Sequence, residues 1–209
     1  MIIKSKLYKY INTYSNFKES NNLKNIRKKK IKNINYKNMS DYLLGRFLSL
    51  ISLIKTPNNI LEIGTFLGYS TLCLSEGLKK KGLLITIDNN KKYINIAKKN
   101  IKKTNINKNI KIIYGDALNI IPKLNLKFDL IFIDADKKNY LNYINLLKNK
   151  MNKNSIILID NALWKGLIIK KQKDKITKYI HKFNEFIKNS KLNNIIIPIR
   201  DGINLIYNS

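Results

Sequence analysis

Two stretches of sequence, F-D-L-I-F-I-D-A-D-K-K-N-Y at 128–140 and I-L-I-D-N-A-L-W at 157–164, are each a continuous apolar run that ends in carboxylates. Buried strands of a parallel sheet have such unbroken apolar runs, and their carboxyl ends open onto the crevice where α/β sheets bind ligands. Two adjacent strands would therefore bring Asp134, Asp160 and Asn161 together. Oxygen ligands of this kind favour hard cations. The sequence thus predicts a divalent-cation site for Mg²⁺, with Ca²⁺ or Mn²⁺ as alternatives.

Around these two stretches, apolar strands alternate with amphipathic helices, which predicts an α/β fold: a doubly wound, Rossmann-like sheet that is mostly parallel. Residues 1–40 are expected to form a helical N-terminal extension, and 41–209 one folding unit. An apolar helix over 41–54 would begin at an N-cap formed by Ser40 or Asp41. The other expected helices lie near 69–80, 90–103, 117–123, 138–150 and 173–190. The expected strands lie near 59–64, 83–88, 110–115, 128–134, 155–160, 194–199 and 203–207. The last two strands would be joined by the turn 200–202 and add an antiparallel edge to the sheet.

The composition restricts the class of protein. No apolar run approaches the ~20 residues of a membrane span, the N-terminus lacks the pattern of a signal peptide, and Cys73 is the single cysteine, so a cytoplasmic protein is expected. The net charge is +28. A nucleic-acid surface would explain this charge, but so would a lysine-rich composition bias, because arginine occurs only at 27, 46 and 200.

The turn after the first strand, I-L-E-I-G-T-F-L-G-Y-S, differs from a dinucleotide-binding loop. Only Gly64 and Gly68 are present where a pyrophosphate site needs three glycines. Glu62 adds a carboxylate that a phosphate would avoid and that a cation would favour. These features predict a nucleoside ligand without phosphates, and S-adenosylmethionine fits.

Acidic residues also end the next two strands. Asp88 would accept hydrogen bonds from both ribose hydroxyls, and Asp116 with Ala117 would meet the adenine edge. Singly, each could be no more than a helix N-cap. Three acidic strand ends in this order, each followed by a helix, favour a nucleoside site.

The motifs L-E-I-G-T-F-L-G-Y-S-T, I-D-A-D-K-x-x-Y and D-N-A-L-W resemble those of the class I, metal-dependent O-methyltransferases, which include the caffeoyl-CoA and catechol O-methyltransferases and small bacterial relatives. The resemblance extends from about Tyr10 to the C-terminal P-I-R-D-G-I-N-L. It implies a homodimer that contacts through its N-terminal helices. It also implies that S-adenosylmethionine is held by Ser40, Glu62, Gly64, Thr65, Ser70, Asp88, Ala117 and Asp136, and the metal by Asp134, Asp160 and Asn161.

The same resemblance implies that Lys137 is the general base. Three residues after Asp134, its amine would lie near the metal, and the metal's charge together with partial burial would lower its pKa. One difference concerns Lys165, which stands where the plant enzymes carry a substrate-contacting Asn and hints at a more anionic acceptor. The segment from Lys165 to Lys173 is expected to be a mobile lid, and Trp164 to pack over the rim of the site.

The expected reaction is methyl transfer from S-adenosylmethionine to the hydroxyl of a small molecule. Two alternatives remain. The acceptor could be a hydroxylated uridine in tRNA, with the basic N-terminal helices gripping phosphate, or the chain could be a non-catalytic RNA-binding relic of the fold. A dehydrogenase is disfavoured because the third glycine is missing.

Overall fold

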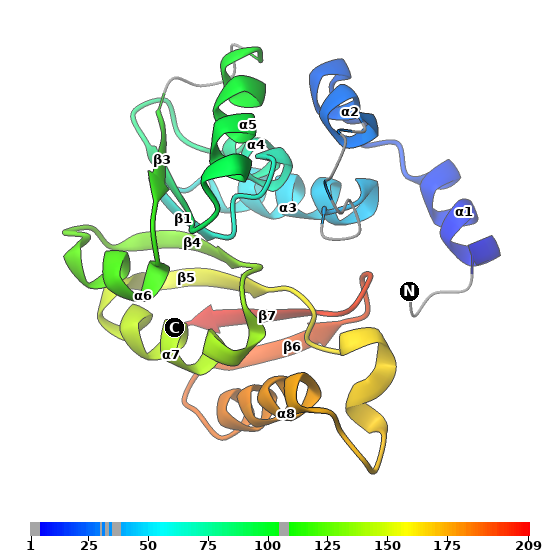
Figure 1. Ribbon diagram of the computed structural model, residues 1–209, viewed down its shortest axis with the longest axis vertical. Coiled ribbons are helices and arrows are strands. Elements are labelled where there is room, and N and C mark those ends of the chain that lie inside the picture. Colours follow the sequence, from blue (N-terminus) through cyan, green and yellow to red (C-terminus); the bar gives the residue numbers. More distant parts are fainter. Residues whose placement is uncertain (1–4, 30, 32–33, 35–38, 105–108) are drawn as a thin grey trace.

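The computed structural model describes residues 5–29, 31, 34, 39–104 and 109–209. Its centre is a seven-stranded sheet of order β3-β2-β1-β4-β5-β7-β6 (Figure 1). β1 to β5 pair with one another in parallel, whereas β7 pairs antiparallel with both β5 and β6. The strands are β1 (Asn59–Ile63), β2 (Leu83–Asp88), β3 (Ile110–Tyr114), β4 (Phe128–Ile133), β5 (Met151–Ile159), β6 (Asn193–Ile197) and β7 (Ile203–Asn208).

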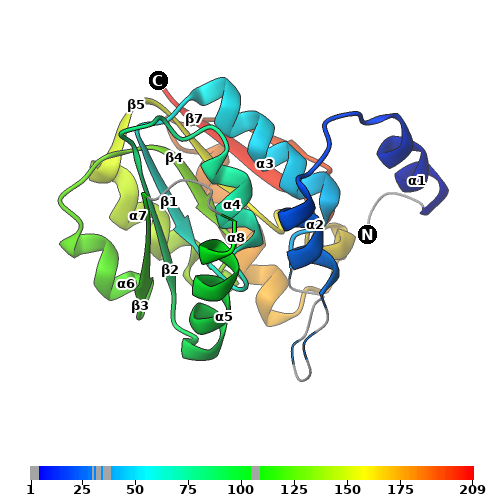
Figure 2. The ribbon, with the colours of Figure 1, turned by 90° about the horizontal axis from the view of Figure 1, so that it is seen from above.

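Helices cover both faces of this sheet, as Figure 2 shows from above. α6 (Ala117–Ile120), α7 (Tyr140–Leu147) and α8 (Lys175–Lys188) lie on one face, and α3 (Tyr42–Lys55), α4 (Tyr69–Ser75) and α5 (Lys91–Lys102) on the other. Short 3₁₀ segments complete them: η2 (Ile121–Lys123), η3 (Lys137–Asn139), η4 (Lys148–Lys150) and η5 (Trp164–Ile169). The predicted doubly wound sheet with an antiparallel edge is confirmed.

The central strands are buried on both faces, which explains their unbroken apolar sequences. Successive side chains of a strand point to opposite faces, so Leu61 and Ile63 of β1 pack with the α6–α8 layer while Ile60 packs with the α3–α4 layer. Cys73 lies fully buried in that second layer. Burial raises the pKa of its thiol to about 12, as expected of a packing residue.

Within the described part of the N-terminal segment, two helices precede α3. α1 (Ser5–Tyr14) lies at the outer edge of the molecule, whereas α2 (Asn21–Lys28) packs beside α4. Leu23 and Ile26 of α2 are buried in the α3–α4 layer, so part of the N-terminal extension contributes to the core. No helix in the described ranges is long and apolar enough to cross a membrane.

Most element bounds agree with the sequence to within a few residues. The N-cap of α3 is Asp41, whose Oδ1 accepts a hydrogen bond from the backbone N–H of Leu44 at 3.0 Å. α4 is shorter than predicted and ends at Ser75. The predicted helix over 138–150 is α7 flanked by two 3₁₀ turns, and β5 begins at Met151 rather than at residue 155.

Candidate active site

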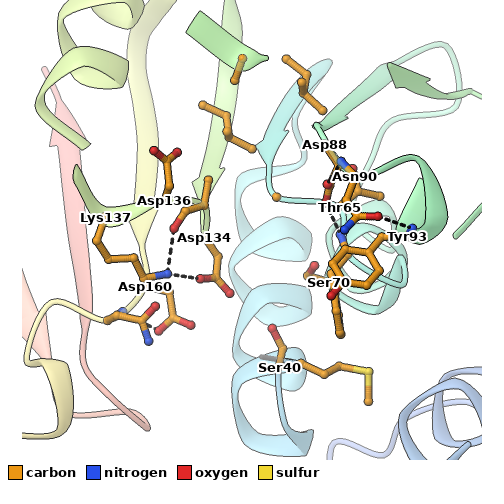
Figure 3. Close-up of a pocket in the computed structure, with 18 of the residues that line it drawn as sticks. Ser40, Thr65, Ser70, Asp88, Asn90, Tyr93, Asp134, Asp136, Lys137 and Asp160 are labelled. Carbon is orange, nitrogen blue, oxygen red and sulfur yellow. Dashed lines mark hydrogen bonds and ion pairs between the residues drawn. The ribbon is translucent and has the colours of Figure 1, made fainter. Parts of the chain in front are cut away.

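A cavity of about 460 Å³ opens at the carboxyl ends of the central strands. Figure 3 shows its two ends: Asp88, Asn90 and Tyr93 on one side, and Asp134, Lys137 and Asp160 on the other. The structure therefore brings together residues far apart in the sequence. The predicted site residues that line the cavity are Ser40, Gly64, Thr65, Ser70, Asp88, Asp116, Ala117, Asp134, Asp136, Lys137, Asp160 and Asn161.

The turn after β1 forms the floor between the two ends. Gly64 has φ of +105°, and a Cβ at this position would lie 2.2 Å from the carbonyl oxygen of Asp134. Any side chain would therefore push the β1 and β4 loops apart, which explains the glycine. Beyond it, the backbone N–H of Phe66 donates to Oδ2 of Asp88 at 2.8 Å. The turn and the end of β2 are thus fixed to each other.

Asp88 is oriented by two backbone donors, because Asn90 N–H also donates to its Oδ1 at 2.8 Å. Burial raises the pKa of this carboxyl group, while the backbone hydrogen bonds oppose the rise. Each carboxylate oxygen can accept more than one hydrogen bond, so Asp88 retains acceptor capacity toward the cavity it lines.

Phe66 and Tyr93 were not predicted as site residues. Their rings meet edge to face, with centroids 4.6 Å apart, and both line the cavity beside Asp88. Tyr93 is placed by the start of α5, where the side chain of Asn90 caps the backbone N–H groups of Lys92 and Tyr93. The sequence shows an N-cap pattern at Asn90. It does not show which face of α5 meets the site, and so it did not indicate Tyr93.

Glu62 does not line the cavity, contrary to its predicted role as a direct cofactor ligand. Its carboxylate is fully buried and accepts hydrogen bonds from the hydroxyls of Ser70 (2.5 Å), Thr86 (2.6 Å) and Thr71. The strand alternation that sends Leu61 and Ile63 to one face sends Glu62 to the other, under α4. Burial raises the pKa of Glu62 to about 7. Glu62 is therefore linked to the cavity lining by hydrogen bonds, directly to Ser70 and through Thr86 to Thr65.

At the other end of the cavity, Asp134 follows β4 and Asp160 follows β5. Oδ1 of Asp160 accepts the backbone N–H of Asn161 at 2.7 Å, whereas its Oδ2 is buried without a hydrogen bond. Burial, and secondarily the negative charge of Asp134, raises the pKa of Asp160. A buried carboxylate oxygen lacking a donor, beside a second carboxylate, fits a bound cation.

The donors available for that cation are two carboxylates and one amide. Among the described residues no cluster of three or more His, Cys, Asp or Glu could hold a metal, so the third protein oxygen would be the amide of Asn161, which lines the same cavity. Asn161 has φ of +65°, a conformation that Asn tolerates better than most residues. This donor set suits Mg²⁺ or Ca²⁺ rather than zinc.

The ammonium of Lys137 lies between these groups. Its Nζ donates to Oδ1 of Asp134 and to the carbonyl oxygen of Ala135, each at 2.9 Å. Burial alone would lower the pKa of Lys137, but the hydrogen bond to Asp134 and the negative charges of Asp134, Tyr140 and Asp160 together outweigh it, and the pKa is raised. The lowering of this pKa that is expected beside a bound metal stays a prediction. Lys137 stays protonated while Asp134 faces it.

Arg200 is a second cation that the sequence did not assign to the site. It was expected only in the turn between β6 and β7, but its side chain lines the cavity. Its Nη1 lies 3.7 Å from Oδ2 of Asp160, and its Nε 3.8 Å from Oδ2 of Asp41. Asp41 in turn accepts a hydrogen bond from the hydroxyl of Tyr8 in α1 at 2.6 Å. The sequence signal that could have pointed to Arg200 is its rarity, because arginine is scarce in this lysine-rich chain.

The loop after β5 carries Trp164 and Lys165 into the cavity wall. Both have left-handed backbone angles, with φ of 42° and 57°. The backbone N–H groups of Leu163 and Trp164 donate to the carbonyl oxygen of Asp201 at 2.7 and 3.2 Å, so the β6–β7 turn holds this loop. Trp164 thus lies at the site as expected. The mobility predicted for residues 165–173 remains a prediction.

The class I methyltransferases share this Rossmann-like architecture. It consists of a doubly wound sheet with acidic strand ends, a Gly-Thr-Phe turn and a cavity at the carboxyl ends of the central strands. A family model described as O-methyltransferase matches residues 12–209. The chain belongs to the O-methyltransferase family, whose members are methyl-transferring enzymes.

Individual relatives agree with this assignment. The chain is similar to a catechol O-methyltransferase of Niastella koreensis, with 36% identity over 129 residues that cover 60% of this chain and 58% of that protein. It is also similar to caffeoyl-CoA O-methyltransferase 1 of Nicotiana tabacum, with 30% identity over 175 residues that cover 77% of this chain and 73% of the relative. An O-methyltransferase from Bacillus cereus, solved in complex with SAH, superposes with a TM-score of 0.85 at 25% identity and covers 98% of this chain and 97% of that one.

Proposed function

We propose that this protein transfers a methyl group from S-adenosylmethionine to a hydroxyl oxygen of a small molecule, with a divalent cation to activate that hydroxyl. One observation carries the proposal: a single cavity has a nucleoside-type carboxylate, Asp88, at one end and the cation-type group Asp134, Asp160 and Asn161 at the other. Such a cavity can hold the methyl donor and the acceptor side by side.

At the first end, Asp88 would bind the ribose hydroxyls, because its carboxylate is fixed in place by two backbone donors and still faces the cavity. Asp116 and Ala117 would face the adenine edge, with Phe66 and Tyr93 beside the nucleoside as apolar surface. The Bacillus cereus structure, which holds SAH, supports this assignment.

At the second end, Asp134, Asp160 and Asn161 would hold the divalent cation, which would lower the pKa of an acceptor hydroxyl. Binding of a cation by Asp134 would also remove the attraction that keeps Lys137 protonated. The amine of Lys137 could then accept the hydroxyl proton as a general base. The rest of the wall, including Trp164, holds the reactants in line and excludes water, and positioning of this kind can supply much of the rate.

The tRNA alternative depends on the basic surface. All three arginines lie beside carboxylates of this chain: Arg27 beside Glu19, Arg46 beside Glu76, and Arg200 beside Asp41 and Asp160. A phosphate grip would therefore rely on exposed lysines, which bind phosphate as point charges. Transfer to bulk tRNA that falls steeply with added salt would favour this acceptor. Transfer to catechol that tolerates salt would favour the small molecule.

The test is isothermal titration of S-adenosylmethionine into the wild type, into Asp88→Asn and into Asp160→Asn, with Mg²⁺ and with a chelator. Asp88→Asn should weaken cofactor binding by about tenfold to a hundredfold, the range for a hydrogen bond to a charged group. Asp160→Asn should bind the cofactor nearly as well, yet lose Mg²⁺ binding and methyl transfer to catechol. Absence of cofactor binding in the wild type would overturn the proposal and leave the non-catalytic relic as the better account.

A further inference from the structure

The loop after β5 carries two of the three predicted cation ligands, Asp160 and Asn161, on a backbone of unusual conformation. Asn161 has φ of 65°, and Trp164 and Lys165 are left-handed as well. Left-handed residues other than glycine persist only where the surrounding structure fixes them. A metal ligand must also be held close to its productive position if the site is to bind tightly. The contacts that fix this loop therefore determine how well Asn161 can serve as a ligand.

Side chains from two helices hold the carbonyl oxygens on either side of Asn161. The hydroxyl of Tyr140, at the start of α7, donates to the carbonyl oxygen of Asp160 at 3.0 Å, and this tyrosine is fully buried. Nδ2 of Asn184, in α8, donates to the carbonyl oxygen of Ala162 at 2.8 Å. The backbone N–H of Ala162 is bound by the β6–β7 turn. Asn161 thus lies between two anchored residues.

Asn184 is itself oriented by a chain of amides. Nδ2 of Asn204, in β7, donates to Oδ1 of Asn184 at 3.5 Å, and Nδ2 of Asn194, in β6, donates to Oδ1 of Asn204 at 3.0 Å. Asn204 is fully buried and lies opposite Ile159 in the sheet. A buried amide costs folding free energy unless it is hydrogen-bonded. Because the donors of this chain run in one direction, Nδ2 of Asn184 is left to face Ala162.

We propose that Asn184 is a positioning residue of the cation site, which acts through the backbone of the loop after β5 and does not touch the cation. Its amide, oriented by Asn204, fixes Ala162. Together with Tyr140 it keeps Asn161 in the left-handed conformation in which this residue lines the cavity. The inference rests on the proposed binding of a divalent cation. Groups that orient metal ligands in this way contribute strongly to metal affinity.

The affinity for a cation tests this role without turnover. Mn²⁺, whose binding is followed by electron paramagnetic resonance, is titrated into the full chain with no acceptor present. Asn184→Leu removes the amide with little change in volume, and Tyr140→Phe removes only the hydroxyl that holds Asp160. Ile180→Val is the matched control, because Ile180 is buried on the same helix and its shortening weakens core packing without removing either hydrogen bond. Urea unfolding measures the stability of each variant.

Asn184→Leu should bind Mn²⁺ about tenfold more weakly than the wild type, the low end of the range for a group that orients a metal ligand. Tyr140→Phe should also weaken Mn²⁺ binding. Both variants should bind S-adenosylmethionine as the wild type does, and Ile180→Val should keep the wild-type affinity for Mn²⁺. If Asn184→Leu does not fold, Asn184→Ser takes its place, since the serine hydroxyl is too short to reach Ala162.

Two results would overturn the inference while leaving the cation site intact. One is equal Mn²⁺ affinity in the Asn184 variant and the wild type. The other is a loss of Mn²⁺ affinity in Ile180→Val as large as that in the Asn184 variant, because the loss would then follow from general destabilisation of α8. Absence of Mn²⁺ binding by the wild type would instead overturn the proposed cation site, and the inference with it.

Discussion

The guanidinium of Arg200 lies 3.7 Å from Oδ2 of Asp160, the buried carboxylate oxygen that accepts no hydrogen bond. The two side chains are 16% and 1% exposed, so little water screens them. Arg200 also approaches Asp41, the N-cap of α3, which is hydrogen-bonded to α1 through Tyr8. This arginine therefore connects the proposed metal ligand to the N-terminal helices and offsets part of the negative charge at the site.

Replacing Arg200 should show whether Asp160 is a metal ligand. Arg200→Gln leaves the buried carboxylate without its neighbouring cation, and in the presence of chelator it should cost about 2 kcal/mol of unfolding free energy. Saturating Mg²⁺ should restore much of this loss, since a bound ion stabilises the folded state. Urea unfolding of the wild type and of Arg200→Gln, each with chelator and with Mg²⁺, measures this loss of unfolding free energy. Lys165→Gln, at the cavity wall, is the control. A loss that Mg²⁺ does not reduce would argue that Asp160 binds no metal.

The sequence could predict the sheet and the line of acidic strand ends because both are local patterns. Apolar runs show where buried strands lie, and parallel strands bring Asp88, Asp134 and Asp160 to one edge whatever the details of packing. The position of Glu62 beneath α4 depends on which face of β1 meets which helix layer. The approach of Arg200 to Asp160 depends on how the β6–β7 turn packs against the β5 loop. Such contacts between distant segments are not encoded in any local pattern.

The role of Lys137 as a base can be tested with two variants that separate its positive charge from its ability to release and accept a proton. Lys137→Met removes both, and should lower kcat for catechol by about a hundredfold or more, the usual contribution of a general base. Lys137→Arg keeps the positive charge beside Asp134 but cannot give up its proton near neutral pH. If Lys137 accepts a proton, the Arg variant should be as slow as the Met variant, whereas rescue by Arg would indicate a purely electrostatic role.

The measurement is kcat with cofactor affinity determined alongside, because both variants should bind S-adenosylmethionine as the wild type does. Lys98→Met, an exposed position on α5 away from the cavity, provides the control for loss of a lysine. A Met variant with normal kcat would remove Lys137 from the mechanism.

The buried Glu62 should make stability depend on pH. Its folded-state pKa is about 7, against 4.5 for a glutamate side chain free in water, because burial disfavours the charged form. The folded protein holds the proton more tightly, so its stability falls as pH rises from about 4.5 through 7. Glu62→Gln lacks this titration and should gain stability relative to the wild type between pH 5 and pH 8, by up to about 3 kcal/mol. Urea unfolding of both proteins at pH 5 and at pH 8 measures this gain. A difference in unfolding free energy between the two proteins that is constant with pH would show that Glu62 is already ionised in the folded protein.

The outer face of α1 points to self-association, as the family resemblance implies. Leu7, Tyr10 and Tyr14 are 53%, 58% and 72% exposed, and they recur at helical spacing on α1. An apolar stripe of this kind on a short helix gains little unless another surface covers it. We expect a homodimer that uses α1, so light scattering at micromolar concentration should give twice the 24.4 kDa of the chain. Tyr10→Asp with Tyr14→Asp should shift it toward the monomer, whereas Lys98→Met should not. A wild-type mass near 24.4 kDa would contradict the dimer.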